Sequence, residues 1–158
     1  MKNCTHCRNA PATLNCGICN CALCKNCEEY VDPNSFSYRE KVSTDLTQGH
    51  YCHACFESHL KPEIEKYQQT LEKAHAVYIF FESKPTPRTL LKKANKGISV
   101  NKCLDKDQTF LRLGFLAAEK GYNAVTNASV ERTLPRKLWK GKGIPALIDA
   151  KKQERFEF

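Results

Sequence analysis

The sequence has no long hydrophobic run. Its longest apolar stretch, residues 76–81, is far shorter than the roughly 20 residues that cross a bilayer as a helix. No apolar segment follows the first methionine either, so we expect neither a membrane span nor a signal peptide. Without an export signal we expect a reducing intracellular compartment, cytoplasmic or nuclear, in which thiols do not form disulfides.

The sequence also lacks the common short motifs of catalysis. It contains no nucleophile elbow, no phosphate-binding glycine loop and no His-Glu-x-x-His motif. These absences favour a binding or adaptor protein, with another protein as the partner, over an enzyme.

Cysteine, in contrast, is abundant and unevenly placed. Nine of the ten cysteines precede residue 56, and the tenth is Cys103. Eight of them form four Cys-x-x-Cys pairs, namely Cys4/Cys7, Cys16/Cys19, Cys24/Cys27 and Cys52/Cys55. A pair with this spacing bends the backbone around one face of a metal ion, so four pairs are enough for two tetrahedral sites. The pattern predicts two structural Zn²⁺ ions, with no open position for a catalytic water.

Cys21 leaves an alternative open among the ligands. If Cys19-x-Cys21 supplied ligands, Cys16 would become spare. We prefer the Cys16/Cys19 pair because Gly17 permits a tight turn between them. Four histidines lie close to the cysteines, and we expect them to be exposed or to hydrogen-bond near the metal, since four pairs already fill two sites. They are His6, His50, His53 and His59.

Charge divides the chain into two halves. Residues 1–73 contain eight Lys/Arg and nine Asp/Glu, whereas residues 74–158 contain seventeen Lys/Arg and eight Asp/Glu, a formal net charge of +9. Eight thiolates and two Zn²⁺ would make the first half more acidic still. A basic second half indicates an anionic partner, or a solvated lysine-rich surface.

Five basic residues surround the single tryptophan, Trp139. They are Arg132, Arg136, Lys137, Lys140 and Lys142. Interleaved basic and aromatic side chains hold phosphates and stack bases, so nucleic acid is an alternative partner. The other interpretation is a loop anchored by a buried Trp139.

The hydrophobic pattern predicts an α+β fold in two domains. Residues 1–57 form the metal module, residues 58–73 a connecting helix, and residues 74–158 a small basic α+β domain. The apolar stripe of the helix is Ile64, Tyr67, Leu71 and Ala74, and Pro62 suits its first turn. Few large apolar residues precede this helix, so metal must supply folding free energy, on the order of 10 kcal/mol or more per zinc.

Several further elements are predicted along the chain. Between the last two cysteine pairs, residues 28–51 contain a turn signal and an alternating stretch around Phe36, Tyr38 and Val42, which indicate a hairpin or an ordered loop. In the second domain we expect strands at residues 76–81, 98–100, 123–131 and 144–148. We expect helices at residues 89–94, closed by Gly97, and 108–120, capped by Asp107 and ended by Gly121. In the third of these strands, one side would carry Ala124, Thr126, Ala128 and Val130.

The complete spacing is Cys-x2-Cys-x8-Cys-x2-Cys-x4-Cys-x2-Cys-x24-Cys-x2-Cys. Together with Ala22-Leu23 just before Cys24, it resembles the cross-brace, treble-clef-like zinc fingers of the FYVE, B-box, PHD and RING type, over about the first third of the chain. In these fingers alternate pairs share a metal. The resemblance implies one zinc on Cys4, Cys7, Cys24 and Cys27, and a second on Cys16, Cys19, Cys52 and Cys55.

The chain departs from each of these families at named positions. Ala12-Thr13-Leu14-Asn15 replaces the basic run with which FYVE fingers grip a phosphoinositide, so no phosphoinositide motif is present. The last pair is Cys52/Cys55, where B-box fingers end in histidines. Thr5-His6 and Phe56-Glu57 replace the aliphatic residue and the proline of RING ligases. These departures count against ubiquitin transfer, so a RING-like ubiquitin ligase is kept only as a further alternative.

The second half carries a shorter resemblance. Residues 110–130, which include Gly121 and Asn123, resemble the helix–turn–strand of the bacterial YbjQ-type family. The resemblance covers one supersecondary unit and implies a compact α+β fold without a defined activity.

Overall fold

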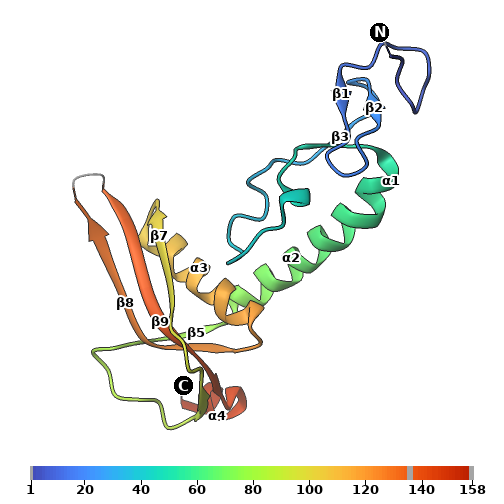
Figure 1. Ribbon diagram of the computed structural model, residues 1–158. Helices are drawn as coiled ribbons and strands as arrows, with labels where there is room; N and C mark the ends of the chain where they lie inside the picture. The colour runs from blue at the N-terminus through green and yellow to red at the C-terminus, as the bar shows by residue number, and fades with distance from the viewer. Residues whose placement is uncertain (1, 135–136, 157–158) are drawn as a thin grey trace. The chain divides into compact units, whose positions relative to one another are not determined.

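The computed structural model describes residues 2–134 and 137–156, with the backbone alone for residues 154–156, and it confirms the mixed α+β class. The chain divides into two compact units, unit 1 (residues 1–68) and unit 2 (residues 69–158). Figure 1 traces the chain through both units. The boundary falls inside helix α2, Lys61–His75, and within the predicted connecting segment 58–73.

Unit 1 contains only very short strands. Strand β1 (Leu14–Asn15) pairs with β2 (Ala22–Leu23), and β3 (Glu29–Tyr30) pairs with β4 (His50–Tyr51), both antiparallel. Pairs of two-residue strands are too short to be stable alone. The core between them combines cysteines with a few large side chains, chiefly Leu23, Phe36, Tyr51 and Leu60.

The long insertion between β3 and β4 is an ordered loop. Its alternating stretch forms no strand in the part of the chain that the structure describes, although a 3₁₀ turn, η1, spans Thr44–Leu46. Phe36 is buried and meets Tyr67 edge to face, with ring centroids 5.5 Å apart. The Arg39 guanidinium lies over Phe36 and pairs with Glu63 at 2.7 Å. These contacts attach the loop to the first turns of α2.

A continuous helical run begins at the last cysteine pair. It consists of α1 (His53–Cys55), a π-helical turn η2 (Phe56–Leu60) and α2 (Lys61–His75). Lys61 N–H donates to the Phe56 carbonyl, five residues back. Pro62 follows this wider turn directly and has no N–H to donate, so the irregularity coincides with the residue that interrupts the ladder. Pro62 is the second residue of α2 and therefore lies in its first turn, as predicted, although the π-helical turn η2 continues into α2 without a break.

Unit 2 is a five-stranded sheet with a helix packed on one face. The strands are ordered β5-β8-β9-β6, and β7 also pairs with β9; only β5 and β8 run parallel. The long hairpin of β8 and β9 and the helix α3 are visible in Figure 1. The elements are β5 (Tyr78–Phe81), β6 (Leu90–Lys93), β7 (Ile98–Cys103), α3 (Lys106–Glu119), β8 (Ala124–Thr133), β9 (Leu138–Ile148) and α4 (Ala150–Phe156).

Leucines of α3 form the centre of this unit's core. Leu113 and Leu116 pack against the strand residues Val100 and Val125. Gly141 of β9 lies beneath the helix, where an added Cβ would be 2.7 Å from the Thr109 side chain. Glycine at this position allows the helix to approach the sheet closely.

The predicted helix at residues 89–94 is wrong, because this segment is strand β6. Leu90 pairs with Ile148 and packs in a second apolar cluster with Ala124 and Ala146. A helix of six residues has little intrinsic stability, whereas the strand gains both ladder hydrogen bonds and burial.

The ends of α3 agree with the sequence at one terminus only. The cap is Asp105, not Asp107: its carboxylate accepts a hydrogen bond from Gln108 N–H at 2.7 Å. At the other end Gly121 has a φ of 87°, and Tyr122 N–H donates to the Ala117 carbonyl at 2.9 Å. The predicted glycine stop is thus confirmed as a Schellman-type turn.

Strand β8 contains a bulge that splits the predicted apolar side. Its register against β9 shifts between Thr126 and Ser129, and Asn127 has a φ of 53°. Ala124 consequently packs with the second cluster, whereas Ala128 packs under α3. The extra residue moves the later side chains to the opposite face.

Candidate metal centre

Eight of the nine N-terminal cysteines gather in two groups. The first thiol group consists of Cys4, Cys7, Cys24 and Cys27, and the second thiol group of Cys16, Cys19, Cys52 and Cys55. Within each group all four sulfur atoms lie within 4.8 Å of one another. The groups alternate along the chain: the first pair meets the third and the second pair meets the fourth, which is the arrangement that the resemblance implied.

The sulfur spacing suits a tetrahedral ion. Cys7 Sγ lies 3.8 Å from Cys24 Sγ, and Cys19 Sγ lies 3.8 Å from Cys52 Sγ. A regular tetrahedron with zinc–sulfur bonds of about 2.3 Å has sulfur–sulfur edges of about 3.8 Å. The residues present therefore fit Zn²⁺, and the set of four thiols is the donor set of a closed structural site.

Two of the pairs share the same backbone turn. Arg8 N–H donates to the Cys4 carbonyl at 2.9 Å, and Asn20 N–H donates to the Cys16 carbonyl at 3.0 Å. Arg8 and Asn20 have φ values of 60° and 62°, in the left-handed region. The residue after each pair, not the glycine inside it, thus completes the turn.

Gly17 has a different role from the predicted one. Its φ is not in the left-handed region, but a Cβ at this position would lie 2.2 Å from the Gln48 Cβ. Gly17 N–H also donates to the His50 carbonyl at 2.8 Å. The missing side chain lets the second cysteine pair approach β4, which leads into Cys52.

The fourth pair uses the start of a helix. Cys52 caps α1, where its sulfur accepts a hydrogen bond from Cys55 N–H at 3.4 Å. Ile18 N–H donates in the same way to the Cys16 sulfur at 3.5 Å. Such donors stabilise thiolate sulfur and orient it.

Backbone donors lower the pKa of one buried thiol in each group. The pKa of Cys4 falls to about 6, chiefly because the Cys7 N–H donates to its sulfur. Burial opposes ionisation of Cys16, but backbone N–H groups, led by that of Cys52, outweigh it and lower its pKa to about 6. These two sulfurs are prepared for the thiolate form that binds metal.

Other members of the groups shift the opposite way. The neighbouring Cys24 thiol raises the pKa of Cys27 to about 12, and burial raises the pKa of Cys55. Four negative sulfurs within 4.8 Å repel one another, so without a cation each group ionises only partly. A divalent ion at the centre would remove this repulsion.

Cys21 lies beside the second thiol group without belonging to it. Its pKa is raised to about 12, first by burial and then by the thiols of Cys19 and Cys52. The group of four contains Cys16 and leaves Cys21 out. The preferred choice of Cys16/Cys19 as ligands remains a prediction, with this geometry in its favour.

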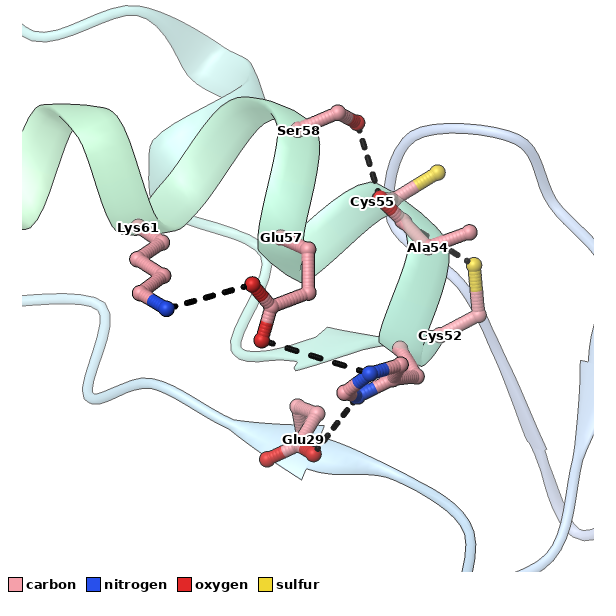
Figure 2. A network of polar contacts seen from close by, with 8 residues as sticks. Glu29, Cys52, Ala54, Cys55, Glu57, Ser58 and Lys61 are labelled. Atoms are coloured by element: carbon pink, nitrogen blue, oxygen red, sulfur yellow. Dashed lines mark hydrogen bonds and ion pairs between the residues drawn. The ribbon is translucent and has the colours of Figure 1, made fainter.

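Two histidines near the fourth pair have carboxylate partners. His50 Nδ1 pairs with Glu28. His53 Nδ1 lies 3.3 Å from Glu29 Oε1 and its Nε2 lies 4.0 Å from Glu57, which also pairs with Lys61 at 3.4 Å. Figure 2 draws this network with Glu29, Glu57 and Lys61 labelled. The histidines His6 and His59 are exposed.

Sequence reasoning missed the two carboxylates, although they stand directly after Cys27. The histidines on either side of Cys52 could have indicated that carboxylate partners lie nearby. The pairing of Glu29 with Tyr51 and of Tyr30 with His50 in β3 and β4 brings the carboxylates to them. The strand pairing therefore places Glu28 and Glu29 beside the histidines of the fourth cysteine pair.

The five basic residues predicted around Trp139 do not share one surface. Lys140 and Lys142 are exposed and line a shallow cleft of about 300 Å³ with Ser99, Asn101 and Ser129. Arg132 pairs in register with Trp139, so both project from the opposite face, where Trp139 packs against the core under α3. Lys137 stands at the start of the returning strand with a φ of 53°, and Arg136 lies outside the described residues.

Lys140 also has an acidic partner in this cleft. Its Nζ lies 2.9 Å from Glu131 Oε1, and the lysine lowers the pKa of that carboxyl group. The exposed pair contributes little to stability.

None of the helices in the described residues is long and apolar enough to cross a membrane. No known family, curated protein or solved structure matches the chain. The arguments for its function therefore come from its own residues.

Proposed function

We propose that unit 1 is a two-zinc cross-brace finger in which both ions are structural. The observation that carries the proposal is the pair of four-thiol groups: in each, the four sulfurs lie within 4.8 Å of one another, and one sulfur–sulfur distance is 3.8 Å, the edge of a tetrahedral zinc site. Four thiolates saturate a tetrahedral zinc, so neither ion keeps a position for water or substrate. Zinc in such a site supplies folding free energy and no catalysis.

A finger of this kind acts by binding, so we propose an adaptor protein with another protein as its partner. One surface feature supports this. Tyr30 is 62% exposed on unit 1, and its ring lies 5.7 Å from that of His50, beside the strand pair that leads into the second thiol group. Exposed tyrosines are enriched among the residues that anchor protein interfaces.

Native mass spectrometry of the reduced full chain tests the metal proposal. We expect two zinc ions per chain, because there are two separate thiol groups. One zinc per chain, or none after purification with zinc present, would contradict the proposal.

The adaptor proposal has its own test. Affinity capture with the zinc-loaded chain should recover a protein partner, and Tyr30→Ser should weaken the capture while keeping both zinc ions. Tyr38→Ser, also in unit 1 but only partly exposed, is a comparison variant. Equal capture by wild type and Tyr30→Ser would remove Tyr30 as the anchor.

A second candidate function is nucleic-acid binding by unit 2. Residues 74–158 carry a formal net charge of +9, and Lys140 and Lys142 stand on one exposed sheet face. Fluorescence anisotropy with single-stranded oligonucleotides at several salt concentrations tests it. Each phosphate contact to a single strand contributes about 0.7 to the slope of log affinity against log salt, so Lys140→Gln with Lys142→Gln should make the slope less steep. The matched pair Lys151→Gln with Lys152→Gln, on α4, should change it less. No binding at low salt would exclude this candidate.

A further inference from the structure

A cavity of about 550 Å³ opens in unit 2, and none of its lining residues belongs to the sheet cleft that Lys140 and Lys142 line. It lies between β5, the loop from β5 to β6, and α4. Figure 1 shows that loop leaving β5 and returning beside α4. Its principal lining residues are Phe80, Lys84, Pro85, Pro87, Arg88 and Gln153. The volume is within the range typical of small-molecule sites.

The walls of the cavity are fixed by the fold. Pro85 and Pro87 restrict the backbone of the loop. Lys84 N–H donates to the Phe81 carbonyl at 3.1 Å. At the other end the buried Thr89 donates its hydroxyl hydrogen to Gln153 Oε1 at 2.9 Å. This hydrogen bond ties the loop to α4 and leaves the Gln153 amide nitrogen as a donor for a ligand.

One wall of the cavity is an aromatic ring. Phe80 lines the cavity, and its ring is nearly parallel to that of Tyr78, with an interplanar angle of 17° and centroids 6.4 Å apart. Both rings are only partly buried. A planar ligand ring can stack against such an aromatic surface, and the stacking does not depend on which substituents the ligand ring carries.

Two cationic side chains, Lys84 and Arg88, line the cavity. Lys84 and Arg88 are exposed, and within the described part of the chain neither has an ion pair or a side-chain hydrogen bond. Among the residues whose side chains the structure describes, no carboxylate lines this cavity, although Glu82 borders a much smaller cavity that adjoins it. A lysine and an arginine together suit a doubly charged group, and guanidinium matches phosphate geometry in particular.

We propose that this cavity binds a nucleotide, with the base stacked on Phe80 and the phosphate held by Lys84 and Arg88. The Gln153 amide would donate to the base edge or the sugar. The same chemistry is offered by a free nucleoside monophosphate and by one nucleotide of a single strand. The inference is independent of the zinc proposal, and its residues differ from those of the sheet cleft.

Isothermal titration calorimetry of the zinc-loaded full chain with AMP at low salt tests the site. We expect AMP to bind, and adenosine and ribose 5-phosphate each to bind at least about tenfold more weakly, because each lacks one of the two recognised parts. Lys84→Gln with Arg88→Gln should weaken AMP at least about tenfold. Phe80→Leu, which keeps an apolar side chain but removes the flat ring, should weaken AMP while ribose 5-phosphate is unchanged.

The control is Lys92→Gln with Lys96→Gln, which removes the same charge from exposed positions of the same unit outside the cavity. This pair should leave the affinity for AMP within about twofold of the wild-type value, because salt screens the interaction of exposed lysines outside the cavity with the bound phosphate. No AMP binding by the wild type, or equal losses in the cavity pair and the control pair, would overturn the inference.

An oligonucleotide arm identifies the source of the ligand. If the nucleotide belongs to a strand, oligo(dA) will displace AMP, bind more tightly than AMP, and lose affinity in the Lys84/Arg88 variant. If the natural ligand is a free nucleotide, AMP will bind more tightly than oligo(dA). The remaining outcome is that oligonucleotides bind, that their binding depends on Lys140 and Lys142, and that AMP does not bind. This outcome would support nucleic-acid binding by the sheet cleft and refute the nucleotide site in this cavity.

Discussion

In unit 1 the strands are two residues long and four of the ten buried core residues are cysteines, whereas in unit 2 β8 and β9 run for 10 and 11 residues over a core of leucine, valine and isoleucine. Unit 2 buries apolar side chains between a helix and a sheet, which is the usual source of folding free energy. Unit 1 has too few such contacts. The difference suggests that the two units respond to different perturbations, metal removal for one and core truncation for the other.

Chelation should have the largest effect, and only on unit 1. Each structural zinc supplies on the order of 10 kcal/mol, which the small core of unit 1 cannot replace. After treatment of the reduced chain with a zinc chelator, hydrogen exchange should become fast throughout residues 2–60 and stay slow in α3. Retained protection of β3 and β4 would contradict this prediction.

Removal of a single ligand should come next in size. Cys24→Ser and Cys52→Ser alter different thiol groups, yet each should release both metal ions, because alternate pairs interlock the two sites. Native mass spectrometry measures this as loss of zinc from the chain.

Two other cysteines provide controls for the ligand variants. Cys21→Ser removes the thiol beside the second group, and Cys103→Ser alters a buried thiol of unit 2, so both should retain two zinc ions. Loss of zinc from Cys21→Ser would show that Cys21 is a ligand in place of Cys16 or Cys19.

Leu113→Ala should have the opposite selectivity to metal removal, because it should destabilise unit 2 and leave unit 1 unchanged. Leu113 is fully buried under α3, and its truncation should lower the free energy of unfolding of unit 2 by about 2–5 kcal/mol without changing the zinc content. The single tryptophan, Trp139, packs against the same core and reports denaturant unfolding by fluorescence. Leu104→Ala, at a side chain 73% exposed, should cost less than about 0.5 kcal/mol.

The smallest predicted effect concerns the cap of α3. Asp105→Ala should lower the free energy of unfolding by about 1 kcal/mol, because Gln108 N–H loses its acceptor. Asp107→Ala removes only a charge from the first turn and should cost less. The same fluorescence measurement ranks the two variants. A larger loss of stability in Asp107→Ala than in Asp105→Ala would show that Asp107 is the cap, as predicted from the sequence.

Local patterns in the sequence were sufficient for the thiols. Cys-x-x-Cys constrains only three consecutive peptide bonds, so the pairs are visible without any knowledge of the fold. The structure groups them in the alternating order that the resemblance implied, while the metal itself stays a prediction. The glycine stop at Gly121 was predictable for the same reason, since a single residue type decides it.

Features that depend on distant pairing were not predictable. Strand β6 exists because β9 offers Ile148 and Ala146 to it from more than fifty residues away. The bulge at Asn127 and the pairing of Arg132 with Trp139, and not with Lys140, both depend on the register of the β8–β9 hairpin. A sequence window around Trp139 shows five nearby basic residues, but strand alternation places Arg132 on one face and Lys140 and Lys142 on the other.

The alternating order of the cysteine pairs also has a consequence for synthesis. The first thiol group is complete once residue 27 has left the ribosome, but the second needs Cys55. During that interval Cys16, Cys19 and Cys21 lie between the members of a finished site while their partners are still missing. A zinc ion that binds at this stage could therefore take a thiol that belongs to the second group. Correct loading requires that such binding be reversible until the chain has lengthened by 28 residues, from Cys27 to Cys55.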